Sequence, residues 1–312
     1  MAFIEMTGIT KTYAGIRALD GVDFDARDGE IHGLVGANGS GKTTLVHIIA
    51  GLVSPDAGRI SIGGSPAAIG GVKGAQELGI GIAYQDSQLI NGITIAQSLM
   101  LGREPRGRFG MIRERDINDA AKDFLGKIGL DDIPVEKSAS LMPDGMRKFV
   151  EAARAILIGT KLAIFDEPTA GLDGEETGRM EVLIRRLKDG GLPVILVSHD
   201  IGFIIGMCDR VTVLDRGSKT GVFVTGETGR DDLSRMIGEP AAFPSRGEPA
   251  GEVVLSLPGG GAELRAGETV GIYVPGGDIK TGLIRSIFGN DPRNSGDYSI
   301  FGFKMRVGPP GG

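Results

Sequence analysis

One short stretch constrains this chain more than any other feature. Residues 36–44 read Gly-Ala-Asn-Gly-Ser-Gly-Lys-Thr-Thr and stand between an apolar run at 30–35 and a helical pattern at 43–50. The glycines allow backbone N–H groups to converge on an anion without a Cβ in the way, and the following helix points its positive dipole end at the same place. A G-x-x-x-x-G-K-T stretch between a strand and a helix predicts a phosphate-binding loop in an α/β fold.

The remainder of the chain predicts a sheet that is covered on both faces. Short apolar runs at 162–165 and 194–197 have the nearly unbroken composition of strands buried on both sides. Amphipathic helical patterns lie beside them in the sequence, at 146–157 and 180–187. This alternation favours the α/β class. We interpret residues 87–158 as a helical insertion on the α/β core.

Composition excludes several other classes of protein. The net charge of −6 provides no general electrostatic reason to coat DNA or RNA. No apolar stretch approaches the ~18 residues of a membrane span. Residues 1–5 lack the basic and apolar regions of an export signal, and Cys208, the single cysteine, cannot form an intrachain disulfide. We therefore expect a soluble protein of a reducing, intracellular compartment.

Side chains suited to nucleotide chemistry stand next to the predicted strands. Lys42 would reach the β- and γ-phosphates, and Thr43 would coordinate Mg²⁺. Asp166, at the end of its strand, would support Mg²⁺, and Glu167 would polarise an attacking water as general base. Two acids at a strand end are ordinary solvated residues by themselves. The glycine-rich loop upstream makes them candidates for a site.

Three further residues join the candidate site by their positions. His199 follows the strand after the one that ends at Asp166, and neighbouring strands would bring it toward the phosphates. Gln85 ends another short apolar run, from which it would reach Mg²⁺ or the water. Tyr13 would stack on a purine ring. Taken alone, Gln85 and Tyr13 would be ordinary surface residues, and a lone histidine is more often a surface or core residue than a catalytic one.

The chain also repeats part of its own sequence. The stretch Gly29-Glu-Ile-His-Gly-Leu-Val is matched by Gly267-Glu-Thr-Val-Gly-Ile-Tyr. At the same offset along the chain Lys42 falls on Lys280. An ordered series of matches at one offset indicates duplication. We expect a first domain at 1–238, a proline-containing linker at 239–251, and the truncated start of a second domain at 252–312.

In combination, these motifs resemble the ATP-binding cassette (ABC) ATPases. Within that family the chain looks most like the ATPase subunits of bacterial monosaccharide and nucleoside importers, which carry two cassettes in one chain. The order of glycine loop, glutamine after a strand, helical insertion, Asp-Glu and Ser-His is that of the family, and stretches such as 79–85 and 93–104 follow its pattern. The resemblance implies a P-loop NTPase cassette with a RecA-like core, an antiparallel β subdomain and a helical insertion.

The resemblance also implies a role for each candidate residue. Tyr13 would be the adenine-stacking residue, and Gln85 the Q-loop residue that senses Mg²⁺ and the transmembrane partner. Asp166 would be the Walker B acid, Glu167 the catalytic base and His199 the switch residue at the γ-phosphate. The Walker A residues that would hold ATP are Gly36, Asn38, Gly39, Ser40, Gly41, Lys42, Thr43 and Thr44.

As a whole, such a protein would be an ABC-type ATPase peripheral to the cytoplasmic face of the plasma membrane, and soluble when isolated. It would couple ATP hydrolysis to uptake of a sugar-like or nucleoside solute. The implied partners are ATP with Mg²⁺, a second cassette in a longer chain or a dimer, transmembrane permease subunits, and a periplasmic or extracellular solute-binding protein. No nucleic acid is expected.

Two stretches depart from the family pattern. Residues 142–146, Met-Pro-Asp-Gly-Met, stand in the slot of the signature sequence Leu-Ser-Gly-Gly-Gln, and only the fourth residue matches. Pro143 offers neither a hydroxyl nor an N–H, and Asp144 adds a negative charge where a phosphate would lie. In the second copy, Val274 and Ile279 replace loop glycines. We therefore predict one competent and one degenerate composite site, with poor ATP hydrolysis by this chain alone.

Three alternatives stay open at this point. Residues 142–146 could be a tolerated variant that still orders around phosphate. The chain could instead be a regulatory or structural module that binds ATP and hardly turns it over. It could also be a soluble ABC ATPase of DNA repair or translation, although the negative charge and the importer-like stretch at 93–104 count against this.

Overall fold

The chain divides into two compact units, residues 1–241 and 242–312. The computed structural model describes residues 2–85, 89–90, 92–106, 110–228, 236, 251–256, 263–266, 268, 297–300 and 303–306. The predicted linker at 239–251 lies outside the described residues except for Gly251, and the second glycine-loop copy at 274–281 lies wholly outside them.

The first unit is built around a six-stranded sheet with the strand order β10-β9-β3-β8-β7-β6. The five strands from β9 to β6 run parallel, and β10 pairs antiparallel with β9. In chain order the bounds are β3 Ile31–Val35, β6 Ile80–Ala83, β7 Leu162–Asp166, β8 Val194–Val197, β9 Arg210–Asp215 and β10 Ser218–Val224. The predicted strands at 162–165 and 194–197 are confirmed.

Strand β7 illustrates why the central strands are apolar without interruption. Leu162 and Ile164 belong to the core that contains α1 (Lys42–Ile49), on one face of the sheet. Ala163 and Phe165 belong to the core on the other face. All four side chains are fully buried. Because successive residues of a strand point to opposite faces, a strand covered on both sides needs an apolar residue at every position.

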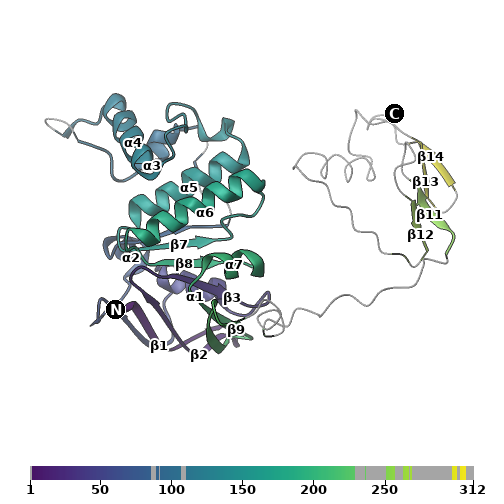
Figure 1. The fold of residues 1–312 in the computed structure, drawn as a ribbon, viewed down its shortest axis with the longest axis horizontal. Coiled ribbons are helices and arrows are strands. Elements are labelled where there is room, and N and C mark those ends of the chain that lie inside the picture. The colour runs from purple at the N-terminus through teal and green to yellow at the C-terminus, as the bar shows by residue number, and fades with distance from the viewer. Residues whose placement is uncertain are drawn as a thin grey trace. The chain divides into compact units, whose positions relative to one another are not determined.

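Helices cover both faces of this sheet, as Figure 1 shows for β7 and β8. α5 (Asp144–Ile158) and α6 (Gly174–Asp189) lie on one side, and α1 lies on the other. The helices predicted at 43–50, 146–157 and 180–187 are confirmed. α6 begins well before its amphipathic stretch, because Asp173 and Glu176 form a reciprocal capping box at its N-terminus.

The regular elements described in the range predicted as a helical insertion, 87–158, are helices, and loops join them. The range contains α3 (Ile95–Met100), α4 (Glu114–Ile128), a short 3₁₀ turn (Ala139–Leu141) and α5. α3 contacts α4 and α5, whereas α5 also packs on β6 and β7 of the sheet. α5 therefore joins this helical part to the strands. The remaining helices are α2 (Gly71–Glu77) and α7 (Ile201–Met207).

A second, antiparallel sheet completes the first unit. Its strand order is β2-β1-β4-β5, and the bounds are β1 Ala2–Tyr13, β2 Ile16–Arg27, β4 Ala57–Ile62 and β5 Ser65–Pro66. Apolar residues of β1, β2 and β4 pack with α1 and with one face of the parallel sheet in a single core. α1 is therefore held between two sheets, so the loop that precedes it has a rigid support.

The second unit contains a four-stranded sheet with the order β12-β11-β13-β14. Its bounds are β11 Val253–Ser256, β12 Glu263–Arg265, β13 Asp297–Ile300 and β14 Phe303–Arg306. All three strand pairs are antiparallel. The order is that of β2-β1-β4-β5, and the register agrees as well: Leu255 pairs with Ile300 as Ile4 pairs with Ile62.

The two sheets differ in the length of their first hairpin. Glu5 pairs with Asp25 in the first sheet, and Ser256 pairs with Glu263 in the second. Far fewer residues separate the second pair than the first, so the second hairpin is much the shorter of the two. The part of the first hairpin that carries Tyr13 therefore has no counterpart in the second sheet.

No helix among the described residues combines the length and the apolar character needed to cross a bilayer. The thiol of Cys208 is buried at the start of the turn into β9, and a Cβ on Gly33 would lie 3.0 Å from its sulfur. Burial raises the pKa of this thiol well above its usual value.

Candidate nucleotide-binding site

The candidate residues follow four neighbouring parallel strands. β3 leads into the 36–44 loop, β8 into Ser198 and His199, β7 into Glu167, and β6 is followed by Gln85. Because these strands are adjacent and parallel, their carboxyl ends meet at one edge of the sheet. Residues that are as far apart in sequence as 36 and 199 therefore line one cavity of about 720 Å³.

The loop at 36–44 needs glycine at two positions for clear steric reasons. Gly36 has φ 153° and Gly41 has φ 105°, values that favour glycine. A Cβ on Gly36 would collide with the carbonyl oxygen of Leu214, and one on Gly41 would lie 2.6 Å from the carbonyl oxygen of Ala18. Gly41 is also the N-cap of α1. The N-terminus of α1 thus opens directly into the cavity.

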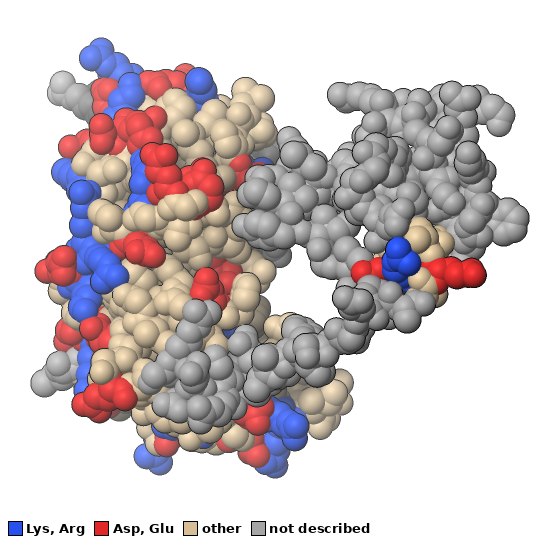
Figure 2. Space-filling view, turned by 45° about the vertical axis from the view of Figure 1, so that its right-hand side comes forward, with Lys and Arg blue, Asp and Glu red and all other residues tan. Residues whose placement is uncertain are grey.

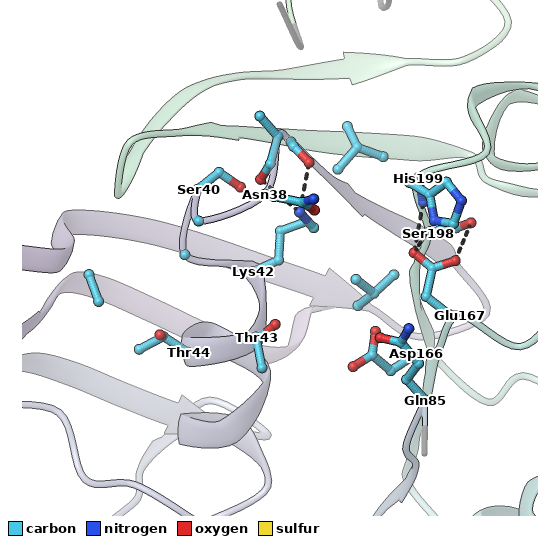
Figure 3. Close-up of a pocket in the computed structure, with 17 residues that line it drawn as sticks. Asn38, Ser40, Lys42, Thr43, Thr44, Gln85, Asp166, Glu167, Ser198 and His199 are labelled. Carbon is cyan, nitrogen blue, oxygen red and sulfur yellow. Dashed lines mark hydrogen bonds and ion pairs between the residues drawn. The ribbon is translucent and has the colours of Figure 1, made fainter. Parts of the chain in front are cut away.

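Lys42 lies across its own loop. Its Nζ donates hydrogen bonds to the carbonyl oxygens of Gly36 at 2.6 Å and Ala37 at 3.0 Å, as Figure 3 shows. Burial lowers the pKa of Lys42, and the negative charges of Glu167 and Asp166 oppose that shift. The ammonium group is therefore already oriented and partly desolvated at the cavity, where it can bind an anion.

Three side chains that carry oxygen atoms line the cavity opposite the glycine-rich loop or at its end. Thr43 lines it from α1, Asp166 from the end of β7, and Gln85 from the segment after β6 (Figure 3). Burial and the neighbouring Glu167 raise the pKa of Asp166 to about 6, against the opposing effects of Lys42 and Lys148. A hydroxyl, a carboxylate and an amide oxygen form a donor set that suits Mg²⁺.

The carboxylate of Glu167 accepts hydrogen bonds at both oxygens. Oε1 accepts from the backbone N–H of His199 at 2.9 Å and lies 2.8 Å from the Nδ1 of the same residue. Oε2 accepts from the hydroxyl of Ser198 at 3.1 Å. Glu167 is 8% exposed, whereas the His199 side chain is 78% exposed. The acid is therefore buried and held in place, and its histidine partner is exposed to solvent.

The remaining loop residues and Tyr13 are placed differently from one another. Asn38, Gly39, Ser40 and Thr44 all line the cavity. The hydroxyl of Ser40 is buried and has no hydrogen-bond partner among the described residues. Tyr13 does not line the cavity; it is 44% exposed at the end of β1, and the ammonium of Lys11 lies 5.6 Å from its ring centroid.

Sequence reasoning misses two residues that contact Glu167. Ser198 stands beside His199, but a serine next to a histidine carries no signal of its own. Lys148 donates from its Nζ to the backbone carbonyl oxygen of Glu167 at 3.2 Å. It lies 19 positions away on α5, and no spacing rule connects a helix residue to a strand end across such a distance.

Fold and site together define an α/β cassette with a phosphate-binding loop, of the class that binds nucleoside triphosphates. Residues 19–170 match the family model described as ABC transporter. The first unit is therefore an ATP-binding cassette of the ABC transporter family.

Known proteins resemble the chain along nearly all of its length. The "Ribose import ATP-binding protein RbsA 1" of Rubrobacter xylanophilus is 38% identical over 319 residues, which cover 98% of this chain and 63% of that protein. The "Ribose import ATP-binding protein RbsA 2" of Streptomyces coelicolor is 37% identical over 317 residues, covering 97% and 60%. The chain thus spans about 60% of the length of these relatives.

A solved structure shares the fold of the first unit. The crystal structure of the ADP conformation of an ATP-binding cassette of an ABC transporter superimposes with a TM-score of 0.65 at 22% identity. The match covers 77% of this chain and 96% of that chain. The ABC cassette fold inferred from the sequence is confirmed by this likeness.

Proposed function

We propose that the chain binds and hydrolyses ATP, and that it powers the import of a ribose-like sugar or a nucleoside. The observation that carries the proposal is the meeting of the 36–44 loop, Asp166, Gln85 and the Glu167–His199 pair in one cavity. A glycine-rich turn alone, or a pair of acids alone, would carry no such conclusion. The import ATP-binding relatives support the same reading.

In the proposed complex the loop amides and Lys42 hold the triphosphate, and the positive end of α1 adds to their attraction. Thr43, Gln85 and Asp166 are the residues that would hold Mg²⁺, which neutralises charge that builds up on the phosphates. Tyr13 lies outside the cavity lining, although Ala18 of the same hairpin belongs to it, so the proposal that Tyr13 stacks on adenine requires a base that extends out of the cavity.

Glu167 is the proposed general base. To take a proton from water, its carboxylate needs an accepting site that points at that water. His199 is the exposed donor of the pair, and a turn of its ring toward the γ-phosphate would free Oε1 while the backbone N–H of His199 stays in place. This gives His199 two partners that alternate, Glu167 and the phosphate.

The substitution Glu167→Gln tests the proposed reaction. A glutamine has nearly the same size but cannot accept a proton, so we expect Mg·ATP binding to persist while single-turnover hydrolysis falls by roughly 10²–10⁴-fold. Calorimetry of binding and radiolabelled ATP turnover measure the two quantities. If wild type and Glu167→Gln hydrolyse ATP at the same rate, the assignment of Glu167 as base is wrong. The alternative of a regulatory module that binds ATP without turning it over is then favoured.

The proposed permease contact lies beside the nucleotide cavity. A second cavity of about 280 Å³ lies between α2, β6 and α5, and apolar residues and the pair Glu151 and Arg154 line it. Tyr84, the neighbour of Gln85, lies at its edge. A helix of a membrane subunit seated there would contact the segment that reaches the cavity. Co-purification with coexpressed permease subunits, lost on Ala83→Glu, tests this location at the inner membrane face.

The second unit is proposed to be the start of a second, degenerate cassette. The shared strand order and register of the two four-stranded sheets support this, together with the sequence matches at one constant offset. The proposed boundaries are 1–238 for the first cassette and 252–312 for the start of the second. A full importer would also use a solute-binding protein outside the membrane.

A weakly hydrolysing module is the second candidate, and the 142–146 slot favours it. Pro143 is the N-cap residue of α5 and provides no side-chain cap, and Asp144 has a 95% exposed carboxylate in the first turn. A phosphate on a facing cassette would meet this negative charge instead of a serine hydroxyl. We therefore propose that ATP bound opposite this slot is hydrolysed poorly.

A role on nucleic acid receives no support from the face of the first unit that Figure 2 shows. On the face shown in Figure 2, basic and acidic side chains of the first unit are interspersed. Binding along a phosphate backbone depends on a concentrated basic surface. A filter-binding assay at low salt that detected tight DNA or RNA binding would revive this alternative.

A further inference from the structure

The backbone of Glu167 adopts a conformation that most residues avoid. Its φ is 50°, and only Ala14 and Arg216 share a positive φ among the described non-glycine residues. Those two precede Gly15 and Gly217 in tight turns, whereas Glu167 precedes Pro168, which restricts the residue before it. A left-handed residue followed by proline has to be held by its surroundings.

The contacts that hold Glu167 come from two directions. The segment at the end of β8 provides one set, through the carbonyl oxygen of Val197, which accepts from the Glu167 N–H at 2.8 Å, and through Ser198 and His199 at the carboxylate. The other direction is α5. From there, the ammonium of Lys148 donates to the Glu167 carbonyl oxygen, which also accepts from the N–H of Ala170 at 3.2 Å.

Lys148 is half-buried and stands one turn after the N-terminus of α5. That N-terminus is fixed against α6: a Cβ on Gly145 would collide with the carboxylate of Glu176, which belongs to the capping box of α6. Lys148 lies on the same 15-residue helix, so its position is fixed relative to that first turn. The hydrogen bond from Lys148 therefore connects the helix that begins within residues 142–146 to the peptide of Glu167.

From this geometry we infer that Lys148 is a positioning residue for Glu167: it keeps the peptide of the proposed base in its left-handed conformation and ties it to the 142–146 slot. Lys148 does not line the nucleotide cavity, so any effect on ATP passes through its neighbours, Glu167 by the hydrogen bond and Asp166 by charge. The inference rests on the proposed function only for its consequence for hydrolysis, and the held backbone can be measured without any nucleotide.

The test compares four forms of the full 312-residue chain: wild type, Lys148→Met, Lys148→Arg and the control Lys219→Met. Methionine removes the ammonium and keeps the length of the side chain, arginine retains a donor, and Lys219 is an exposed residue of β10. Amide hydrogen exchange across residues 166–171 measures how firmly the backbone around Glu167 is held. Single-turnover ATP hydrolysis and the Kd for Mg·ATP report its consequence.

For Lys148→Met we expect amide exchange of Glu167 and Ala170 to speed up by roughly fivefold. We expect hydrolysis to slow by roughly tenfold or more, with the Kd for Mg·ATP within about twofold of wild type. Lys148→Arg should recover most of both effects, and Lys219→Met should match wild type. In a Glu167→Gln background, Lys148→Met should slow the residual hydrolysis no further, because its target is already disabled.

Unchanged exchange across 166–171 in Lys148→Met would overturn the inference, as would a loss of nucleotide affinity as large as the loss of rate. A wild-type chain that binds no nucleotide would refute the proposed function, and the exchange comparison would still decide the role of Lys148. A wild-type chain that binds ATP without hydrolysing it leaves the exchange comparison as the deciding result.

Discussion

The two units contain four-stranded antiparallel sheets of the same topology, which differ in the length of their first hairpin. Strand order and strand pairing agree between β2-β1-β4-β5 and β12-β11-β13-β14. The first sheet carries a long hairpin that ends at Tyr13, and the second has only a short one in its place. The loop copy of the second unit also replaces Gly36 and Gly41 by Val274 and Ile279.

This comparison separates the scaffold from the binding chemistry. Pairing of strands depends on backbone hydrogen bonds and on a repeating apolar pattern, which many sequences satisfy. A phosphate-binding loop depends on a few residues that cannot be exchanged, because a Cβ at Gly36 or Gly41 collides with the neighbouring backbone. A duplicated cassette can therefore keep its sheet after its nucleotide site is lost.

The largest expected difference between the units concerns their two loop lysines. Lys42→Ala removes the ammonium that faces the cavity, and we expect it to weaken Mg·ATP binding by about 3 kcal/mol, roughly a hundredfold in Kd. Lys280→Ala, at the matching position of the repeat, should leave the affinity unchanged. Calorimetry on both full-length variants measures this. Equal losses would mean that both units bind nucleotide, and no loss in Lys42→Ala would remove the basis of the proposed function.

A smaller difference is expected at the hairpin. Tyr13→Ala should raise the Kd for ATP by roughly fivefold, about 1 kcal/mol, if the exposed ring stacks on adenine. The control is Tyr273→Ala, which the repeat places at the position of Val35 in the first unit. The Kd for inorganic triphosphate, which has no base, should not respond to Tyr13→Ala. A response to triphosphate would show that the ring supports the loop and not the base.

The smallest expected effect concerns how the first unit ties its two sheets together. Arg210 of β9 donates to both carboxylate oxygens of Asp25 in β2, at 2.8 and 2.9 Å. This hydrogen bonding holds the pKa of Asp25 at about 2, below its usual 3.8. Because the folded-state pKa is the lower one, the stabilisation is present above about pH 4 and is lost as the pH falls toward 2.

Asp25→Asn should therefore lower the stability of the first unit by about 1 kcal/mol at pH 7, a value that allows for solvent screening of this partly exposed pair. The Tm should fall by roughly 2–4 °C, with no difference from wild type near pH 2. Asp20→Asn, which breaks an exposed pair with Arg17, is the control and should change little. A loss that persists unchanged at pH 2 would mean that the effect is not electrostatic.

The sequence allowed the fold and most of the site lining to be predicted, for identifiable reasons. The 36–44 loop and the doubly buried strand at 162–165 have compositions that few other structures tolerate. Adjacent parallel strands then bring His199 and Glu167 together, because the two residues follow the neighbouring strands β8 and β7.

The contacts of Glu167 could not be predicted in the same way. The contact of Lys148 depends on which face of α5 packs toward β7, and that of Ser198 depends on the pairing of β7 with β8 and on the serine rotamer. The position of Tyr13 outside the cavity depends on the course of the hairpin, which strand propensity does not determine. Local pattern predicts elements, and tertiary packing decides which side chains meet.

The buried thiol beside Gly33 has a practical consequence for all of these experiments. Cys208 is the single cysteine of the chain, it is 5% exposed, and a raised pKa keeps it in the unreactive thiol form. Maleimide dyes and spin labels should therefore not react with the native chain, and should attach only where a new cysteine is introduced on the surface. The wild-type background is already suited to fluorescence and electron spin resonance measurements of how its parts move as nucleotide is taken up and released.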